Sequence, residues 1–271
     1  MGADGNAQNI WRLSIFVKTV ANLRYFIFIS YKGTSYHGWQ VQPNAVTVQQ
    51  LLDEALTTIL SEEVSTTGAG RTDTGVHASV FCAHFDSVSP DLDSSKNLIY
   101  RLNSYLPKDI SITLLRKVRI DANARFSALS RTYKYFVSRE KDPFSEDSSW
   151  YLHGEINRHL MNDASALLLK HTDFTSFSKL HSNVRTNDCK IYYAGWEEKG
   201  NQLIFTIKAD RFLRNMVRAI VGTMIEIGFG KMDLKEFEEI IKARDRGKAA
   251  KSAPARGLFL TGIEYPEDIY I

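Results

Sequence analysis

The segment from Gly68 to Ala78 carries the residues best suited to chemistry. It reads Gly-Ala-Gly-Arg-Thr-Asp-Thr-Gly-Val-His-Ala, so one carboxylate, Asp73, stands among three glycines just before an apolar stretch. Glycine has no Cβ and accepts positive φ, which permits tight turns and close approach to a ligand. Flanking elements would fix such a loop, while Arg71 and Thr72 can hold the carboxylate ionised and oriented. We therefore predict that Asp73 is a nucleophile or a general base.

The glycines of this segment do not form a nucleotide-binding loop. Val76 follows Gly75 where a P-loop requires Lys and then Ser or Thr. Asp73 occupies the place of the third glycine in the dinucleotide fingerprint, where its charge would repel a pyrophosphate. A long hairpin loop with glycine turns remains open as a purely structural interpretation.

No metal or hydrolase signature is present. The spacing of His77, Cys82 and His84 matches no zinc pattern, and the last two simply share one face of a strand. The sequence also lacks a Gly-x-Ser-x-Gly elbow and a His-Glu-x-x-His helix. We predict neither a metal site nor a cofactor.

Cations and aromatic residues alternate in the middle of the chain, at residues 125–127 and 131–135. Such mixtures suit nucleic acid, because cations meet phosphates and rings stack on bases. Tyr133 and Tyr135 share a face by alternation, so core packing is the better interpretation for at least one of them.

Three arginines recur in a narrow stripe along a predicted helix that begins at Leu213. We expect Arg211 and Arg214 to form a solvated basic face. Arg218 lies at the apolar boundary, where a half-buried guanidinium needs an anionic partner, and Asp73 is the candidate.

The composition is that of an ordinary globular protein. The 271 residues are 44% hydrophobic with net charge +3, so they can form one large or two medium domains without demanding a polyanionic partner. Residues 5–52 contain no acidic residue, which suits either a local basic surface or a solvated face plus a tail. Cys82 and Cys189 lie far apart, which favours a reducing compartment over a disulfide framework. No apolar run approaches the ~18 residues of a membrane helix.

The periodicity predicts the same order of elements twice, β-α-β-β-α-β. Strands are expected at 23–31, 64–67, 79–85, 111–118, 131–138, 190–198, 203–209 and 258–265, and helices at 47–60, 97–105, 159–169, 213–227 and 233–243. Capping boxes are expected at Thr47 with Gln50 and at Asp233 with Glu236. The predicted class is α+β: two ferredoxin-like halves fused into one mainly antiparallel sheet, with helices on one side and a central cleft. We expect an extension outside the fold at 1–22, with a transit peptide as an alternative, and halves at 23–125 and 126–271.

Eight motifs together make the chain resemble the TruA family of tRNA pseudouridine synthases. In the family's order they are Gly33-Thr34-x-Tyr36-x-Gly38-Trp39-Gln40-x-Gln42-Pro43, Gly70-Arg71-Thr72-Asp73 through Ala78, Leu102-Asn103 with Leu106-Pro107, Ala124-Arg125-Phe126-Ser127-Ala128, Arg131-x-Tyr133-x-Tyr135, Asp173-Phe174-Thr175-Ser176-Phe177, Phe212-Leu213 with Met216-Val217-Arg218, and Ala253-Pro254 with Gly257-Leu258. The chain departs from the family pattern at Lys32, Thr74, Arg214-Asn215 and Ala255, and none of these changes removes a catalytic group.

The resemblance implies a cytoplasmic homodimeric isomerase that acts on tRNA without metal or cofactor and needs no membrane. Family members convert uridines at positions 38 to 40 of the anticodon stem-loop to pseudouridine. Carried over by motif, Asp73 is the catalytic nucleophile, and Tyr133 stacks on the target uracil. Arg71 and Arg218 accompany them as substrate-binding residues, and Leu258 is an apolar wall of the pocket. Open alternatives are a synthase for other RNA uridines, a noncatalytic RNA-binding module, and a metal-dependent nuclease, which would need clustered carboxylates.

Overall fold

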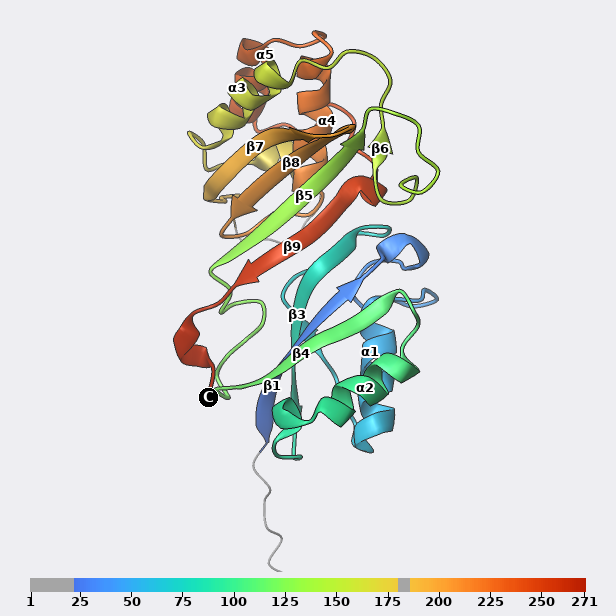
Figure 1. Ribbon diagram of the computed structural model, residues 1–271. Helices are drawn as coiled ribbons and strands as arrows, with labels where there is room; N and C mark the ends of the chain where they lie inside the picture. The colour runs from blue at the N-terminus through green and yellow to red at the C-terminus, as the bar shows by residue number, and fades with distance from the viewer. Residues whose placement is uncertain (1–21, 180–185) are drawn as a thin grey trace, which may run out of the picture.

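The computed structural model of the protein describes residues 22–179 and 186–271 (Figure 1). The extension predicted for residues 1–22 lies outside the described residues except for Asn22. The first strand begins at Leu23, as predicted.

The strands are β1 (Leu23–Tyr31), β2 (Thr67–Gly68), β3 (His77–Ser87), β4 (Ile110–Val118), β5 (Ser130–Ser138), β6 (Trp150–Tyr151), β7 (Ile191–Lys199), β8 (Gln202–Ala209) and β9 (Leu258–Glu264). The α-helices are α1 (Val48–Leu60), α2 (Lys96–Tyr105), α3 (Arg158–Leu168), α4 (Met216–Gly228) and α5 (Leu234–Ala243). Among residues 22–179 and 186–271, no helix has both the length and the apolarity needed to cross a bilayer.

One sheet runs through the whole molecule, in the order β4-β1-β3-β9-β5-β8-β7. Neighbouring strands along this path are antiparallel, except that β3 and β9 pair in parallel through His77 with Phe259 and Ala78 with Leu260. Off the path, β2 pairs with β3 and β6 with β5. The predicted α+β class with a mainly antiparallel sheet is thus confirmed, and the short β3·β9 contact joins its two parts at mid-molecule (Figure 1).

Helices α1 and α2 pack on one face of the β4-β1-β3 part. Alternate residues of β1, Tyr25, Ile27 and Ile29, share a buried cluster with Leu52 of α1 and Leu102 of α2. The other face of β1, including Phe26, is covered by the segment after β4 and by residues that follow β9, in a second buried cluster. Because successive side chains of β1 point to opposite faces of the sheet, this strand contributes to two separate cores.

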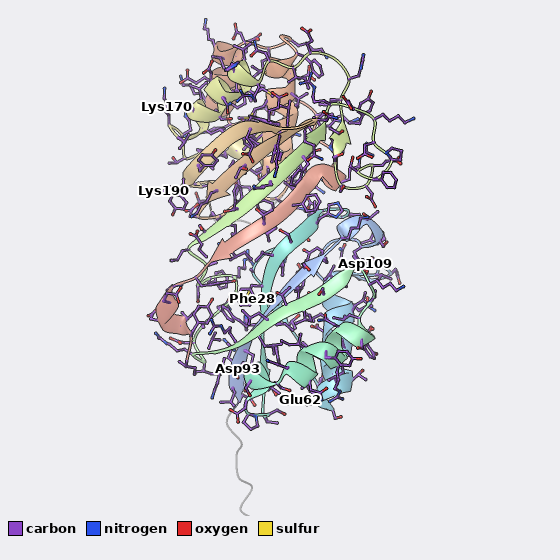
Figure 2. All side chains as sticks on the ribbon, in the orientation of Figure 1. Phe28, Glu62, Asp93, Asp109, Lys170 and Lys190 are labelled. Atoms are coloured by element: carbon purple, nitrogen blue, oxygen red, sulfur yellow. The ribbon has the colours of Figure 1, made fainter. Side chains whose placement is uncertain are left out.

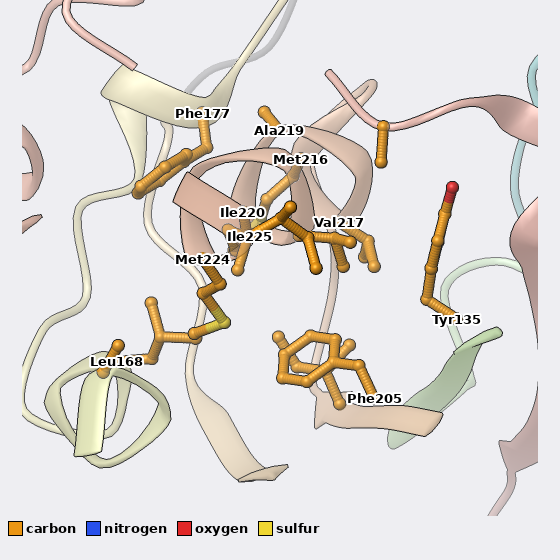
Figure 3. Packing of buried hydrophobic residues seen from close by; sticks show 14 of the residues in the cluster. Tyr135, Leu168, Phe177, Phe205, Met216, Val217, Ala219, Ile220, Met224 and Ile225 are labelled. Atoms are coloured by element: carbon orange, nitrogen blue, oxygen red, sulfur yellow. The ribbon is translucent and has the colours of Figure 1, made fainter. Parts of the chain in front are cut away.

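The β9-β5-β8-β7 part packs against α3, α4 and α5. Tyr135 of β5 and Phe205 of β8 face Val217 and its neighbours on α4, as Figure 3 shows. Leu258 and Leu260 lie two residues apart on β9 and so share a face; the first belongs to this cluster and the second to the cluster of α1 and α2. All five helices therefore cover the same face of the sheet. In Figure 2, Lys170 and Lys190 mark this part, and Glu62 and Asp93 mark the other.

Some predicted caps and strand bounds differ from the structure because polar side chains form other hydrogen bonds there. Thr47 caps α1 as expected, but the side chain of Gln50 donates to Glu54 instead of completing a capping box. The Asp233–Glu236 box of α5 is confirmed. Residues 64–66 were predicted as strand; instead Val64 and Thr66 hydrogen-bond side chains of α1, and only Thr67 and Gly68 pair with β3.

The fourth helix begins three residues later than predicted. Asn215 adopts a left-handed conformation, with φ of 66°, and precedes the first helical residue, Met216. Arg214 therefore lies in the turn before α4 and not on the helix, and Arg211 lies in the irregular segment that precedes this turn. The left-handed residue therefore determines where the side chain of Arg214 lies.

Candidate active site

The loop between β2 and β3, residues 69–76, is held from beneath by the segment after β1. Gly38 has φ of +88°, and a Cβ on it would lie 2.3 Å from the carbonyl oxygen of Thr72. The backbone N–H of Trp39 donates to that carbonyl at 3.3 Å, and the Thr72 hydroxyl is 2.9 Å from the hydroxyl of buried Tyr31. These contacts fix the residue next to Asp73, so the loop presents the carboxylate from a defined position.

His77 closes the loop and ties it to the distant end of the chain. Its Nδ1 accepts from the N–H of Gly33 at 3.0 Å, which leaves Nε2 to donate to the carbonyl of Arg256, also at 3.0 Å. The side chain is fully buried, and this burial lowers its pKa, so the imidazole is neutral. His77 is therefore a structural link and not a free base.

Arg218 meets the carboxylate from α4. Its Nη1 lies 3.6 Å from Oδ2 of Asp73, and its Nε donates to the carbonyl of Ala253 at 2.7 Å. The N–H of Ala253 in turn donates to the carbonyl of Arg218. The expected pair is thus present, and the guanidinium is anchored at a second point.

Arg214 is solvated, as expected, and it also lies beside the carboxylate, which was not predicted. Its Nε is 3.6 Å from Oδ1 of Asp73, although the arginine side chain is 59% exposed. The left-handed turn at Asn215 delivers Arg214 to the loop, and the same asparagine side chain donates to Ser252. Arg214 was predicted on the helix that begins at Leu213, whereas it lies in the turn before α4.

Tyr133 stands where the two helix-covered cores meet. It is partly buried and packs against both clusters, and its ring meets Phe212 edge to face with 5.1 Å between centroids. Desolvation raises the pKa of Tyr133 to about 12; Arg131 opposes the shift, and the charge of Asp73 adds to it. The phenol is therefore neutral at physiological pH and within electrostatic reach of the carboxylate. Tyr135, on the same face, is a core residue.

Arg131 ties three segments together around the start of the loop. Its guanidinium donates to the carbonyls of Ala69, Arg125 and Asp210. Desolvation lowers its pKa. Arg131 belonged to a predicted motif but had no predicted role. Its acceptors are backbone carbonyls, which every residue has, so residue types do not reveal them.

Two other predicted site residues are less closely engaged. Arg71 is exposed, two residues before Asp73. Leu258 is 6% exposed and belongs to the core of the β5-β8-β7 part, opposite Tyr135 in register. Their suggested roles stay predictions.

The histidines near the loop already have partners within the protein. His84 accepts the N–H of Ala124 at Nδ1, and both ring nitrogens of His77 are used. Within the described parts of the chain, no group of three His, Cys, Asp or Glu side chains is placed to hold a metal ion.

Together these residues put one carboxylate opposite two guanidinium groups and near a neutral phenol ring. Asp73 is 25% exposed, so a ligand can reach it. A charge-compensated carboxylate suits nucleophilic or base chemistry, and an aromatic ring beside cations suits a nucleobase with its phosphates.

The matching family model and the similar proteins of known name indicate the same family. The family described as tRNA pseudouridine synthase matches residues 27–127 and 164–266, together more than half of the chain. The protein named tRNA pseudouridine synthase A from Bacteroides thetaiotaomicron is 50% identical over 250 residues, covering 91% of this chain and 92% of that protein. Its namesake from Porphyromonas gingivalis is 48% identical, covering 92% and 99%. The one from Thermoanaerobacter sp. (strain X514) is 40% identical, covering 88% and 98%.

Proposed function

We propose that this chain, which belongs to the tRNA pseudouridine synthase family, converts uridine to pseudouridine at positions 38 to 40 of the tRNA anticodon stem-loop, with Asp73 as nucleophile. The observation that carries the proposal is the ion pairing of Asp73 with Arg214 and Arg218 within electrostatic reach of Tyr133. The names of its relatives support tRNA as the substrate.

The reaction suits a lone carboxylate. It breaks the C1′–N1 glycosidic bond of uridine, turns the uracil and rejoins it to C1′ through C5, and the C5 proton passes to N1. Atoms and electrons balance within the nucleotide, so the isomerisation needs no cofactor. Asp73 supplies the nucleophile, and the two guanidinium groups compensate its charge before the base arrives.

The target base must leave its stack to reach Asp73. Flipping a nucleotide costs a few kcal/mol, and stacking on an aromatic ring recovers about 1–3 kcal/mol. Tyr133 is the proposed stacking partner, and its hydroxyl is neutral because its pKa is raised to about 12. Arg71, which is exposed, is proposed to take the place the base vacates, and Leu258 to border the pocket.

The strand order supports the predicted ferredoxin-like halves. In the first half the order is β4-β1-β3 with β2 on the far side of β3, and in the second it is β9-β5-β8-β7. Both are the fourth, first, third and second strand of a β-α-β-β-α-β unit. We propose halves at 23–125 and 126–271 with an RNA-binding cleft between their helical layers.

The assembly and location proposed with this function are a homodimer in the cytoplasm. Two buried free cysteines, Cys82 and Cys189, are compatible with a reducing compartment. A synthase that modifies other RNA uridines is the second candidate, since nothing in the site geometry selects positions 38 to 40.

Mapping pseudouridine after incubation of unmodified tRNA with protein tests the proposal. Wild type is expected to modify positions 38 to 40, and Asp73→Asn to form no product while it still binds tRNA. Asp53→Asn, which alters a carboxylate bonded to Thr66 away from the site, is the matched control and is expected to retain activity. Substantial turnover by Asp73→Asn would refute the nucleophile, and product only at other uridines would favour the second candidate.

A further inference from the structure

The two arginines beside Asp73 are attached very differently. The side chain of Arg218 is 21% exposed and is fixed at a second point by the carbonyl of Ala253. The side chain of Arg214 is 59% exposed, and within residues 22–179 and 186–271 its guanidinium pairs with Asp73 alone. One cation is thus built into the scaffold, and the other reaches the carboxylate from the surface.

The pair between Arg214 and Asp73 is one that can open easily. Both arginines lie 3.6 Å from a carboxylate oxygen, beyond the usual N–H···O hydrogen-bond range, but Arg214 is the more exposed and lacks the second anchor that holds Arg218. An exposed ion pair at this separation contributes little to stability and is screened by salt. The guanidinium can therefore leave Asp73 without disturbing the fold, and Arg218 remains to compensate the carboxylate.

Positive charge continues around Arg214 at the surface. The backbone N–H of Lys179 donates to the carbonyl of Arg214 at 3.0 Å, and the lysine residue is exposed. Arg71 is an exposed residue of the loop itself, two residues before Asp73. A strand that inserts a nucleotide toward Asp73 carries its phosphates past this margin, and a guanidinium binds a phosphate by two parallel hydrogen bonds.

We propose that Arg214 is an exchangeable cation, which pairs with Asp73 in the free protein and moves to a backbone phosphate of bound RNA. Arg218 stays on the carboxylate in both states. The inference rests on the proposed function, because it takes RNA as the substrate. In this proposal Arg214 positions the RNA strand. The carboxylate of Asp73 and an RNA phosphate compete for the Arg214 guanidinium.

A double-mutant binding experiment tests the competition. The dissociation constant of an unmodified tRNA is measured for wild type, Asp73→Asn, Arg214→Gln and the double variant, at several salt concentrations. Arg214→Gln is expected to weaken binding about tenfold and to reduce the slope of log K against log salt by about one. Asp73→Asn is expected to tighten binding about threefold, because Arg214 is released, and to give no gain in the Arg214→Gln background.

Arg211→Gln is the matched control. It removes the same charge from the same connection between β8 and α4, but the Arg211 guanidinium donates to the carbonyl of Thr186 and not to Asp73. The gain from Asp73→Asn is expected to persist in this background. An equal gain in the Arg214→Gln background, or wild-type affinity and salt slope for Arg214→Gln, would overturn the proposal.

Kinetics separate the exchange from a role in the chemical step. For Arg214→Gln, most of the loss in kcat/KM is expected in KM. A loss confined to kcat, with the dissociation constant unchanged, would also overturn the exchange. Failure of the proposed function reads differently: wild type would form no pseudouridine in tRNA, whereas the exchange is decided by the binding measurements, which need no turnover.

Discussion

Corresponding connections in the two parts of the sheet are built in opposite ways. Strands β7 and β8 pair from Ile191 to Lys199 and are joined by a tight turn at Gly200-Asn201. Strands β2 and β3 pair only at Thr67 and Gly68, and the intervening residues form the loop of Asp73. The same position in the order of elements holds a regular hairpin in one half and a reactive loop in the other.

The difference shows that short pairing between β2 and β3 leaves residues for the loop of Asp73. Shortening β2 leaves the first residues of β3 free to pair with β9, and this contact brings α4 with Arg218 to the loop. The loop must then be held by side-chain and backbone contacts from Tyr31, Trp39 and His77, because no strand ladder holds it. The β7–β8 hairpin needs no such support.

The largest difference in stability loss is expected between two glycine substitutions, one beside the Asp73 loop and one in the β7–β8 turn. Gly38→Ala combines a positive φ with a Cβ 2.3 Å from the Thr72 carbonyl oxygen, and is expected to cost about 3 kcal/mol or more of unfolding free energy. Gly200→Ala also has a positive φ but no neighbour within 4 Å, and is expected to cost about 1 kcal/mol. Urea unfolding of both variants checks this, and equal losses would contradict the contrast.

Conservative changes to ion pairs are expected to affect activity only at the loop. Arg218→Lys cannot reach both Asp73 and Ala253, and is expected to lower kcat about 100-fold, or about 2.7 kcal/mol. Arg158→Lys alters a pair with Glu198 on β7 and is expected to leave kcat within about twofold. Single-turnover assays compare the two; a similar loss in both variants would mean that Arg218 acts only through stability.

Hydrogen-bond deletions sharpen the same comparison. Tyr31→Phe removes the hydroxyl that meets Thr72, and is expected to cost about 1 kcal/mol of stability and to lower activity about tenfold. Asn162→Ala removes two bonds that tie α3 to Trp196 of β7, and is expected to lower stability by about 1–2 kcal/mol without lowering kcat. The free energy of unfolding and kcat are measured for both variants. Loss of activity in Asn162→Ala would contradict the contrast between the two regions.

Mild acid is expected to loosen the half that holds the loop first. Burial lowers the pKa of His77 and of His84, both on β3, so the unfolded chain binds more protons than the folded one below about pH 6.5. Their contribution to stability is present above that pH and is lost as the pH falls from there through the lower pKa values of the folded state. Amide exchange at pH 7.5 and 5.5 is expected to accelerate in β1 and β3 more than in β7 and β8, and His77→Gln to reduce the difference.

The sequence predicted the parts of the fold that depend on local periodicity. The helices predicted at 47–60 and 233–243 have nearly the observed bounds, and the strands predicted at 190–198 and 203–209 form a hairpin. Strand β6 and the parallel contact of β3 with β9 were not predicted, because each has only two residue pairs and depends on distant segments. Residues 64–66 failed as a strand because Asp53 and Thr57 of α1 bind their polar groups.

At the candidate site, residue type identified Asp73 and its pairing with Arg218, since a half-buried guanidinium demands an anion. It did not identify Arg214, because that requires knowing that Asn215 turns left-handed before α4. Helical periodicity extended one turn too far thus hid the second partner of the carboxylate.

Residues after β9 return to the far end of the sheet and finish the first half. Tyr270 bridges to Val118, the N–H of Arg119 donates to Ile269, and the hydroxyl of Tyr265 donates to Ala124. A ribosome that has made β1 to β4 has therefore produced a sheet whose face around Phe26 is still bare. The last residues that cover this face follow β9 in the chain, so the buried cluster around Phe26 is complete only when the whole second half has been synthesised.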